Sequence, residues 1–504
     1  MSTISDPVSA PPARAVQPGY RTLWRWHFYA GLFVMPLLLV LAITGTIYCF
    51  QPQIEPLLYP HRLVVAPAAT PRLPVDALLA RARTALPADA RALRAHVESN
   101  PARSAEFVFA LPGGRKESVY VNPYDGNVLG TLDVDRRFMQ VDRMLHRKLL
   151  LGKPGELLVE LAACWTLVMI ATGIALWWPR AGASWRAALL PRFGASGRPF
   201  WKSVHASIGI WLAVGALAFV LSGLPWTGSW GKQFKALATR ASLGAPRAAW
   251  GGGLALKSVL PGAPAAASGS AAPPPASHAG RQEHGGEHAG HDMASMPGMV
   301  MDDMPLPLVP WAVGALPVPR SPDGSAAASA PRHWTLAQVV AQMRDLGVLD
   351  GYDIVLPATP DGVYTVSNFP PDPKAERTVY IDRYSGAVLR DIRYEDYGAV
   401  SQAISYGTSL HMGRYFGLAN QLICAAISLG LGALAVTGFA MWWLRRPTRA
   451  KGASGTLAAP PRERAAPPLR AWKTALVLLG IVFPLMGATL VAVWLFDRAA
   501  FRRA

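Results

Sequence analysis

Four histidines stand near the ends of long apolar stretches of the sequence: His27, His146, His205 and His411. Neutral imidazole is the commonest metal ligand in proteins, and a six-coordinate haem iron accepts two imidazoles from opposite sides. An ionisable side chain beside a membrane span is costly unless it has a function. These residues therefore predict haem ligation, and the alternative is that they are ordinary interfacial histidines. No Cys-x-x-Cys-His motif exists, which excludes covalent c-type haem.

The spacing around these histidines repeats within the chain. A pair of small residues follows each histidine, after 17 residues in two cases and after 26 in the other two: Thr44-Gly45 after His27, Ser222-Gly223 after His205, Thr172-Gly173 after His146 and Thr437-Gly438 after His411. The chain is therefore a duplication, so His27 is expected to pair with His205, and His146 with His411. The small residues would let helices pack closely and leave room for a flat cofactor.

Five apolar stretches are long enough to cross a bilayer, which needs roughly 20 residues of helix. Of the 504 residues, 51% are hydrophobic and 16% are charged, whereas about 25% are charged in soluble proteins. All three cysteines lie inside these stretches and are interpreted as small buried hydrophobic residues. The sequence thus predicts a polytopic α-helical membrane protein, made of duplicated two-span halves and a fifth span. The net charge of +18 is assigned to membrane orientation, with no nucleic-acid partner.

Two short connecting loops, 179–202 and 444–473, are rich in Lys and Arg, which places them in the cytoplasm. The N-terminus joins them there, and the long segments between spans then lie on the opposite side of the membrane. The C-terminal residues Arg498, Arg502 and Arg503 fall outside under this topology, against the rule.

Each long outer segment has the pattern of a small α+β domain. Helical patterns at 75–86 and 335–346, the second capped by Thr335, precede hairpins with Gly126 and Gly386 at the tight turns. The predicted organisation is: 1–24 tail, 25–50 span 1, 51–145 periplasmic domain 1, 146–178 span 2 with its lead-in, 179–202 loop, 203–224 span 3, 225–332 connection with an insert, 333–410 periplasmic domain 2, 411–443 span 4 with its lead-in, 444–473 loop, 474–496 span 5 and 497–504 tail.

The insert is rich in Ala, Pro, Gly and Ser, and one part of it carries histidines and methionines. Imidazole and thioether groups crowded together suit copper. The candidate copper ligands are His284, His288, His291, Met293, Met296 and Met299. The alternative is a low-complexity tract with incidental metal affinity.

Several segments resemble the PepSY-associated transmembrane family, including Trp24-Arg-Trp-His27, Met144-Leu-His-Arg147, Thr172-Gly-Ile-Ala-Leu-Trp-Trp178 and the two Tyr-x-x-x-Tyr-x-Gly hairpins. The resemblance implies two periplasmic PepSY-like domains. It also implies a di-haem b-type electron conduit, similar to the ferric-siderophore reductases, which converts Fe(III) to Fe(II) in the periplasm. PepSY domains also occur in peptidase propeptides. The alternatives are therefore a module that binds or inhibits a periplasmic protease or relays a signal, and a copper-handling or Cu(II)-reducing protein.

Under the haem interpretation, Arg25, Arg147 and Arg414 could pair with haem propionates, and interfacial snorkelling is their alternative. The short cytoplasmic loops contain no GxGxxG after a strand, so quinol in the bilayer or a separate cytoplasmic reductase is the expected electron donor. The expected acceptor is a periplasmic ferric chelate. No residue is predicted to be catalytic.

Overall fold

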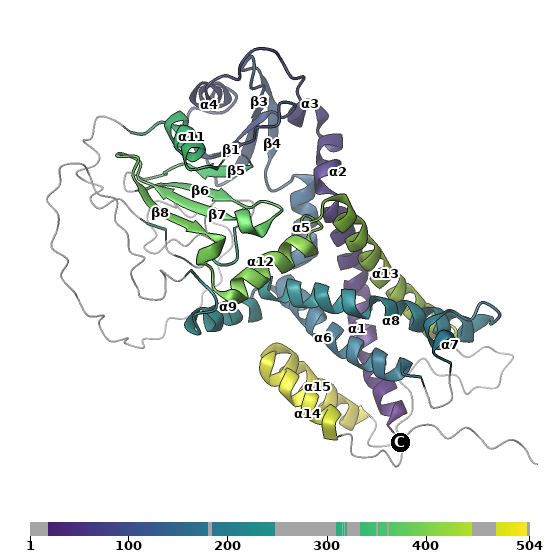
Figure 1. The fold of residues 1–504 in the computed structure, drawn as a ribbon. Helices are drawn as coiled ribbons and strands as arrows, with labels where there is room; N and C mark the ends of the chain where they lie inside the picture. Colours follow the sequence, from purple (N-terminus) through teal and green to yellow (C-terminus); the bar gives the residue numbers. More distant parts are fainter. Residues whose placement is uncertain are drawn as a thin grey trace, which may run out of the picture. The chain divides into compact units, whose positions relative to one another are not determined.

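A computed structural model describes residues 19–179, 184–246, 309–314, 316, 318–319, 333–348, 351–359, 362–445 and 470–500. The chain divides into two compact units, and Figure 1 shows their elements. The span unit comprises residues up to 43, 151–224 and 426 onward, whereas the sheet unit comprises 44–150 and 225–425.

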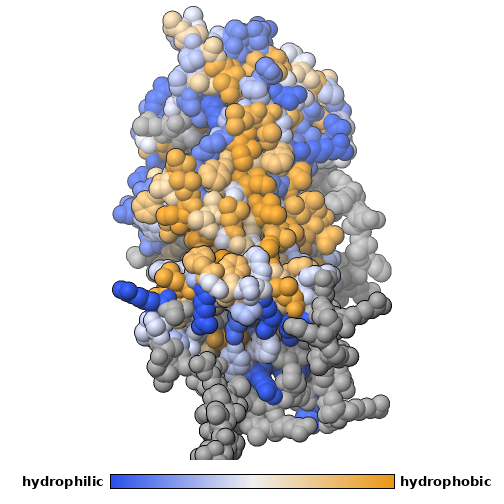
Figure 2. Space-filling view, turned by 90° about the vertical axis from the view of Figure 1, so that its right-hand side faces the viewer, coloured by the Kyte–Doolittle hydropathy of each residue, from blue (hydrophilic) through white to orange (hydrophobic). Residues whose placement is uncertain are grey.

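The described residues include four helices that are long and apolar enough to cross a membrane: α1 (Tyr20–Cys49), α6 (Lys153–Trp177), α8 (Gly197–Gly223), which continues into η1 (Leu224–Trp226), and α13 (Leu418–Trp443). On one face of the molecule, hydrophobic residues gather in a broad zone (Figure 2). Side chains that are more than half exposed include Leu32, Trp211, Val214 and Ile423. Such surface suits lipid rather than water, and the chain is a membrane protein. Two short helices, α7 (Trp185–Leu189) and α9 (Trp230–Arg240), lie in connecting segments.

The predicted fifth span, 474–496, is not one helix, so this expectation is corrected. It is divided into α14 (Arg470–Val482) and α15 (Pro484–Ala500). Pro484 disfavours a helical conformation of the residue before it, which ends α14. α14 has 13 residues and is therefore about 20 Å long, short of a hydrocarbon core of roughly 30 Å. The two helices fold back against each other (Figure 1), and Gly480 approaches so closely that a Cβ there would lie 3.1 Å from Gly487 Cα.

The sheet unit contains one antiparallel sheet of eight strands, in the order β4-β3-β2-β1-β5-β6-β7-β8. Its strands are β1 (Arg91–Val97), β2 (Ala105–Ala110), β3 (Lys116–Val121), β4 (Val128–Asp133), β5 (Tyr352–Val355), β6 (Tyr364–Asn368), β7 (Arg377–Ile381) and β8 (Val388–Arg393). The sequence predicted two separate domains, 51–145 and 333–410, and this is corrected. Their edge strands β1 and β5 pair with each other, with Ala95 opposite Ile354, so neither edge is left open.

One face of this sheet packs against α4 (Val75–Arg83) and α11 (Leu336–Asp345), as predicted from their helical patterns. The core between them includes Phe107, Ile354 and Met343, all buried. Thr335 is the N-cap of α11, as predicted, and it forms a capping box with Gln338. Gly126 and Gly386 have φ of 75° and 70°, as the hairpin turns required.

The sheet unit also contains short helices: α2 (Gln51–Leu58), α3 (Pro60–Leu63), α5 (Phe138–Lys148), α12 (Ala399–His411), η4 (Pro373–Ala375) and η5 (Tyr394–Asp396). Two of them carry histidines of the predicted set. His146 lies on α5 and His411 is the last residue of α12, each separated by a turn from the following span helix. The turn after α5 contains Leu149 and Leu150 in the left-handed conformation, at φ of 50° and 57°. The expected lead-ins to spans 2 and 4 are therefore separate helices.

Candidate metal-cofactor site

The imidazoles of His27 and His205 lie beside each other in the span unit. Their ring centroids are 6.2 Å apart and their planes are nearly perpendicular, at 87°. Two imidazoles that bind one metal ion from opposite sides, each at about 2 Å, have ring centres roughly 6 Å apart. The separation therefore fits one metal ion between the two rings.

A threonine on a neighbouring helix holds each of these imidazoles. His27 Nδ1 lies 2.9 Å from Thr172 Oγ1 on α6, and the Thr172 hydroxyl donates its proton to Val168 O at 2.6 Å. Because that proton is already used, Thr172 Oγ1 can only accept from His27 Nδ1–H. This fixes the tautomer and leaves Nε2 with a free lone pair, the form that binds metal.

The second imidazole is held in the same way. His205 Nδ1 lies 2.9 Å from Thr437 Oγ1 on α13, and the Thr437 hydroxyl donates to Ala433 O at 2.8 Å. The glycine after each threonine makes room for the ring, since a Cβ on Gly173 would lie 3.3 Å from His27 Cε1 and one on Gly438 would lie 3.7 Å from His205 Cε1. The repeated Thr-Gly pairs thus orient the imidazoles.

The two histidines line a cavity of about 440 Å³ in the span unit. This volume lies within the range of about 300–1,000 Å³ typical of small-molecule sites. The walls are mainly apolar and aromatic, with Gly31 and Gly209 one helical turn beyond the two histidines. Such walls would exclude water and accept a flat, largely apolar ring system.

Three cations also line this cavity: Arg198, Lys202 and Arg445. The Arg198 guanidinium lies over the Trp24 ring at 5.8 Å from its centroid, and its Nε is buried without a hydrogen-bond partner among the described residues. A buried donor of this kind favours an anionic partner, so the residues fit a macrocycle that carries carboxylates. The predicted propionate partner Arg25 is not among the lining residues. It is buried, and its Nη2 donates to Tyr29 Oη at 3.1 Å.

In the sheet unit, His146 repeats the same arrangement. Its Nδ1 lies 2.9 Å from Thr44 Oγ1, near the end of α1. His411 ends α12, and its carbonyl oxygen accepts a hydrogen bond from Cys49 Sγ at 4.0 Å. Three of the four predicted histidines are therefore hydrogen-bonded to a threonine of the repeated Thr-Gly pairs.

The other two predicted arginines lie close to these helices. Arg147 Nη2 donates to Trp226 O at 3.3 Å, and Arg414 Nη2 donates to Phe369 O at 2.7 Å. Together with Arg143, which the sequence reading missed, both lie within electrostatic range of the Tyr48 phenol. Burial lowers the pKa of Arg414, and its Nη1 has no hydrogen-bond partner among the described residues. Anionic groups would be bound favourably there.

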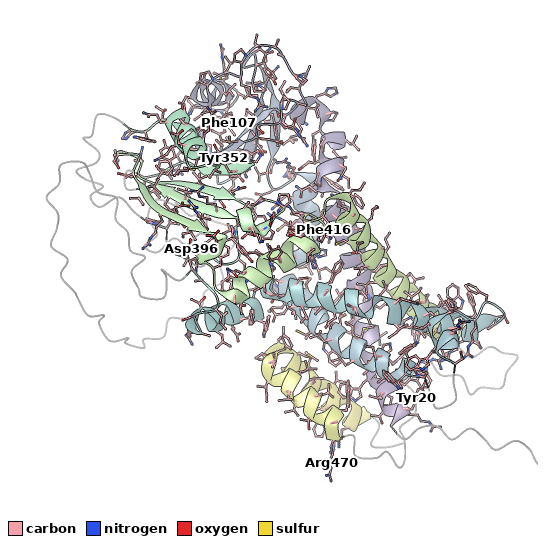
Figure 3. All side chains as sticks on the ribbon, viewed as in Figure 1. Tyr20, Phe107, Tyr352, Asp396, Phe416 and Arg470 are labelled. Carbon is pink, nitrogen blue, oxygen red and sulfur yellow. The ribbon has the colours of Figure 1, made fainter. Side chains whose placement is uncertain are left out.

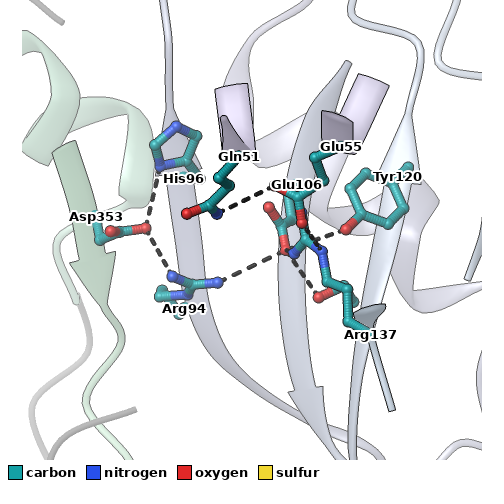
Figure 4. A network of polar contacts seen from close by, with 9 residues as sticks. Gln51, Glu55, Arg94, His96, Glu106, Tyr120, Arg137 and Asp353 are labelled. Carbon is teal, nitrogen blue, oxygen red and sulfur yellow. Dashed lines mark hydrogen bonds and ion pairs between the residues drawn. The ribbon is translucent and has the colours of Figure 1, made fainter. Parts of the chain in front are cut away.

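A buried network of charges positions α5, which carries His146 (Figure 4). Arg137, the residue before α5, binds Glu55 of α2 at 2.7 Å and Glu106 of β2 at 3.0 Å. Arg94 of β1 lies 3.6 Å from Glu106 and binds Asp353 of β5 at 3.0 Å. The network therefore joins the two halves of the sheet to the start of α5.

Opposing effects set the proton affinity of the central carboxylate in this network. Burial acts to raise the pKa of Glu106, but the charges of Arg137, Arg94 and His96 outweigh burial and lower the pKa to about 2. Glu106 therefore stays ionised at neutral pH and keeps both arginines paired.

A sequence profile described as the PepSY-associated TM region matches residues 24–445. The chain belongs to the PepSY-associated transmembrane family. The match includes α6, α8, α13, all of α1 except its first four residues, and both halves of the sheet. No curated protein matches the chain.

In this PepSY-associated protein, the candidate copper ligands between His284 and Met299 lie outside the described residues. Among the described residues, no group of three or more His, Cys, Asp and Glu side chains could hold a metal ion. The candidate site consists instead of two residues, His27 and His205, whose ring centroids lie 6.2 Å apart.

The sequence reading missed the hydrogen-bonding role of the threonines, although a signal for it existed. Successive spans run in opposite directions, so a residue early in one span lies at the depth of a residue late in the next. His27 is early in α1 and Thr172 is late in α6. A polar residue repeated at the depth of a histidine predicts a hydrogen bond, because unpaired polar groups are costly in a membrane.

Proposed function

We propose that this chain is a di-haem b-type electron-transfer protein of a bacterial inner membrane, which reduces a ferric chelate in the periplasm. His27 and His205 would hold one haem on the cytoplasmic side, and His146 and His411 the other on the periplasmic side. One observation carries the proposal: the two imidazoles lie 6.2 Å apart, and a threonine fixes each as the tautomer with a free Nε2.

When bound, haem would supply a one-electron carrier on each side of the membrane. The chain's own residues would prepare these sites. The threonines hold the imidazoles before binding, which reduces the ordering cost. Arg198, Lys202 and Arg445 would balance the propionate charges in the cytoplasmic-side cavity, and Arg147 and Arg414 would do so on the other side.

The proposed orientation places the N-terminus in the cytoplasm and the sheet unit in the periplasm, in line with the Lys and Arg content of the short loops. Electrons would come from quinol in the bilayer or from a separate cytoplasmic reductase. The ferric chelate would accept one electron, giving Fe(II), which its chelator holds more weakly.

The test is spectroscopic. The full chain, made under haem-replete conditions and purified in detergent, should give a b-type difference spectrum between its reduced and oxidised forms, with two haems per chain. His27→Ala or His205→Ala should each remove one haem, and His146→Ala or His411→Ala should each remove the other. Absence of any b-type signal would refute the proposal, and loss of both haems from every one of these folded variants would refute the pairing.

A further inference from the structure

Helix α9 begins shortly after the end of the third apolar span helix. That span ends with η1 at Trp226, and α9 begins at Trp230. Trp311 contacts both of them, because its Nε1 donates to Pro225 O of η1 at 2.9 Å and its ring centroid lies 6.0 Å from that of Phe234 on α9. α9 therefore lies beside the end of this span.

One face of α9 is packed and the other is exposed. Ala238 is buried against Trp311 and against Ile404 of α12 (Figure 1). The opposite face carries the exposed residues Lys232, Gln233, Ala236, Leu237 and Arg240. Leu237 is 64% exposed, and Arg240, three residues later, is its neighbour on the helix surface. An exposed apolar side chain between cations is typical of a helix that lies in a membrane interface.

The charges of α9 are all positive. It contains Lys232, Lys235 and Arg240 and no acidic residue. Lys235 Nζ lies over the Trp311 ring, 5.2 Å from its centroid, whereas Lys232 and Arg240 are exposed. The described segments that adjoin α9 or pack against it also contain no Asp or Glu: 224–229, 241–246, 309–314 and α12.

The acidic groups around α12 do not cancel this charge. Glu395 and Asp396 are exposed on η5, before α12 (Figure 3). In the preceding strand Asp391 pairs with Arg393 at 2.9 Å. Glu376 packs against α12, and burial raises its pKa to about 7, so it is only partly ionised at neutral pH. Two exposed carboxylates on η5 thus border a surface that carries three cations.

The internal repeat shows that these cations are specific to one half of the chain. In the first half, α2 follows α1 at the equivalent place. α2 contains Glu55 and no Lys or Arg, and Glu55 binds Arg137 at 2.7 Å inside the unit. The duplicated fold therefore forms without cations at this place, so the charge of α9 serves something other than folding.

We propose that α9 binds the headgroups of anionic phospholipids at the membrane surface where α8 and η1 end. Lys232 and Arg240 would donate hydrogen bonds to phosphate oxygens, and Leu237 would insert between the acyl chains. Each cation close to an anionic membrane surface raises affinity about fivefold, so the two exposed cations would favour an anionic over a zwitterionic lipid about 25-fold. This binding requires no haem, so the proposal is independent of the proposed function.

The test places a fluorophore on the exposed face. Ala236→Cys is labelled with a small thiol-reactive dye in the full chain, reconstituted in phosphatidylcholine nanodiscs, and the three native cysteines are buried. Spin-labelled phosphatidylglycerol, which is anionic, or spin-labelled phosphatidylcholine, which is zwitterionic, is added at rising mole fraction. Half-maximal quenching should need about 25-fold less of the anionic lipid than of the zwitterionic one.

Charge substitutions in the labelled chain test the two cations. Lys232→Gln or Arg240→Gln alone should lower the preference to about fivefold, and the two together should abolish it. Lys232→Arg combined with Arg240→Lys keeps both charges and should keep the preference. The matched control is Arg83→Gln with Arg91→Gln, which removes two exposed cations of the same unit outside α9 and should change the preference by less than twofold.

Three outcomes would overturn the proposal. Equal quenching by the two lipids would show that α9 touches the membrane without selecting its headgroups. Quenching by neither would place the exposed face away from lipid and make it a surface for a soluble partner. An unchanged preference in the double Gln variant, with the chain folded by its melting curve, would show that the cations do not bind the headgroups. The haem spectrum of the same samples reports separately on the proposed function.

Discussion

The hydrogen bond from His27 to Thr172 gives the sharpest test of how this site is prepared. Thr172→Val keeps the shape of the side chain and removes the oxygen that accepts from His27 Nδ1–H at 2.9 Å. The change also removes the bond to Val168 O. We expect weaker haem binding on the side of His27 and His205, while the haem assigned to His146 and His411 stays in place.

The magnitude follows from what the imidazole loses. Without its acceptor, a buried Nδ1–H is left unpaired, which costs about 1–3 kcal/mol, and the ring can rotate or change tautomer. Loss of such a hydrogen bond behind a metal ligand typically lowers affinity about 10- to 100-fold. By the repeat, Thr437→Val should have the same effect through His205.

The assay measures haem per chain at rising haem concentration in detergent, together with the melting temperature without haem. Thr166→Val is the matched control. Thr166 lies on the same helix, lines the same cavity and donates the same kind of bond, to Ala162 O at 2.7 Å, whereas the hydrogen bond to His27 is made by Thr172. Thr172→Ser should restore most of the affinity. If Thr172→Val bound haem as tightly as Thr166→Val, the threonine would not orient the imidazole and the tautomer argument would fail.

Three further outcomes are expected. Arg198→Gln should lower haem affinity about tenfold by removing a cavity cation, whereas Arg25→Gln should leave haem affinity within about twofold of wild type. A larger loss of affinity for Arg25→Gln than for Arg198→Gln would support Arg25 as the propionate partner. The pKa of Glu106 is lowered to about 2 from 4.5. Above pH 4.5 the ionised Glu106 should therefore contribute about 3 kcal/mol to the free energy of unfolding, and this contribution is lost as the pH falls toward 2. Glu106→Gln should therefore melt lower than wild type at pH 7, with a gap that closes through this window; a gap independent of pH would contradict the argument. A cysteine placed at Arg498, near the end of α15, should react with an impermeant maleimide from the same side of the membrane as one placed at Arg470, at the start of α14, since α14 and α15 fold back. Labelling from opposite sides would support a fifth span.

Sequence periodicity predicted the four span helices, the two hairpins and the proximity of His27 to His205. Each of these depends on the spacing of residues close together in the sequence or on the internal repeat. The single sheet was not predicted. Its central pairing joins β1 to β5, whose residues Arg94 and Asp353 are 259 positions apart. Local patterns predict which segments form strands, but not which edge strands pair with each other. The complementary charges of Arg94 on β1 and Asp353 on β5 are consistent with the pairing but do not predict it.

Two differences from the sequence-based expectations near the membrane have simple geometric causes. Arg25 is close to His27 in sequence but does not line the cavity, because two residues along a helix turn the side chain by about 200°, away from the histidine. Positions three and seven residues before a histidine share its face, and these are the ones that line the cavity, Lys202 and Arg198 before His205. The fifth span was assigned from hydropathy alone, and Pro484 was overlooked.

The departures from two-fold symmetry say more about the ligand than the symmetry does. Each half holds its own imidazole with its own threonine, so a symmetric ion between them needs nothing else. The rim of the cavity is different: three and seven residues before His27 stand Trp24 and Tyr20, whereas the same positions before His205 hold Lys202 and Arg198. A symmetric ligand would gain nothing from cations on one side only. An apolar ligand with one anionic edge would be stabilised by them, and its anionic edge would lie against Lys202 and Arg198 in the second half of the repeat.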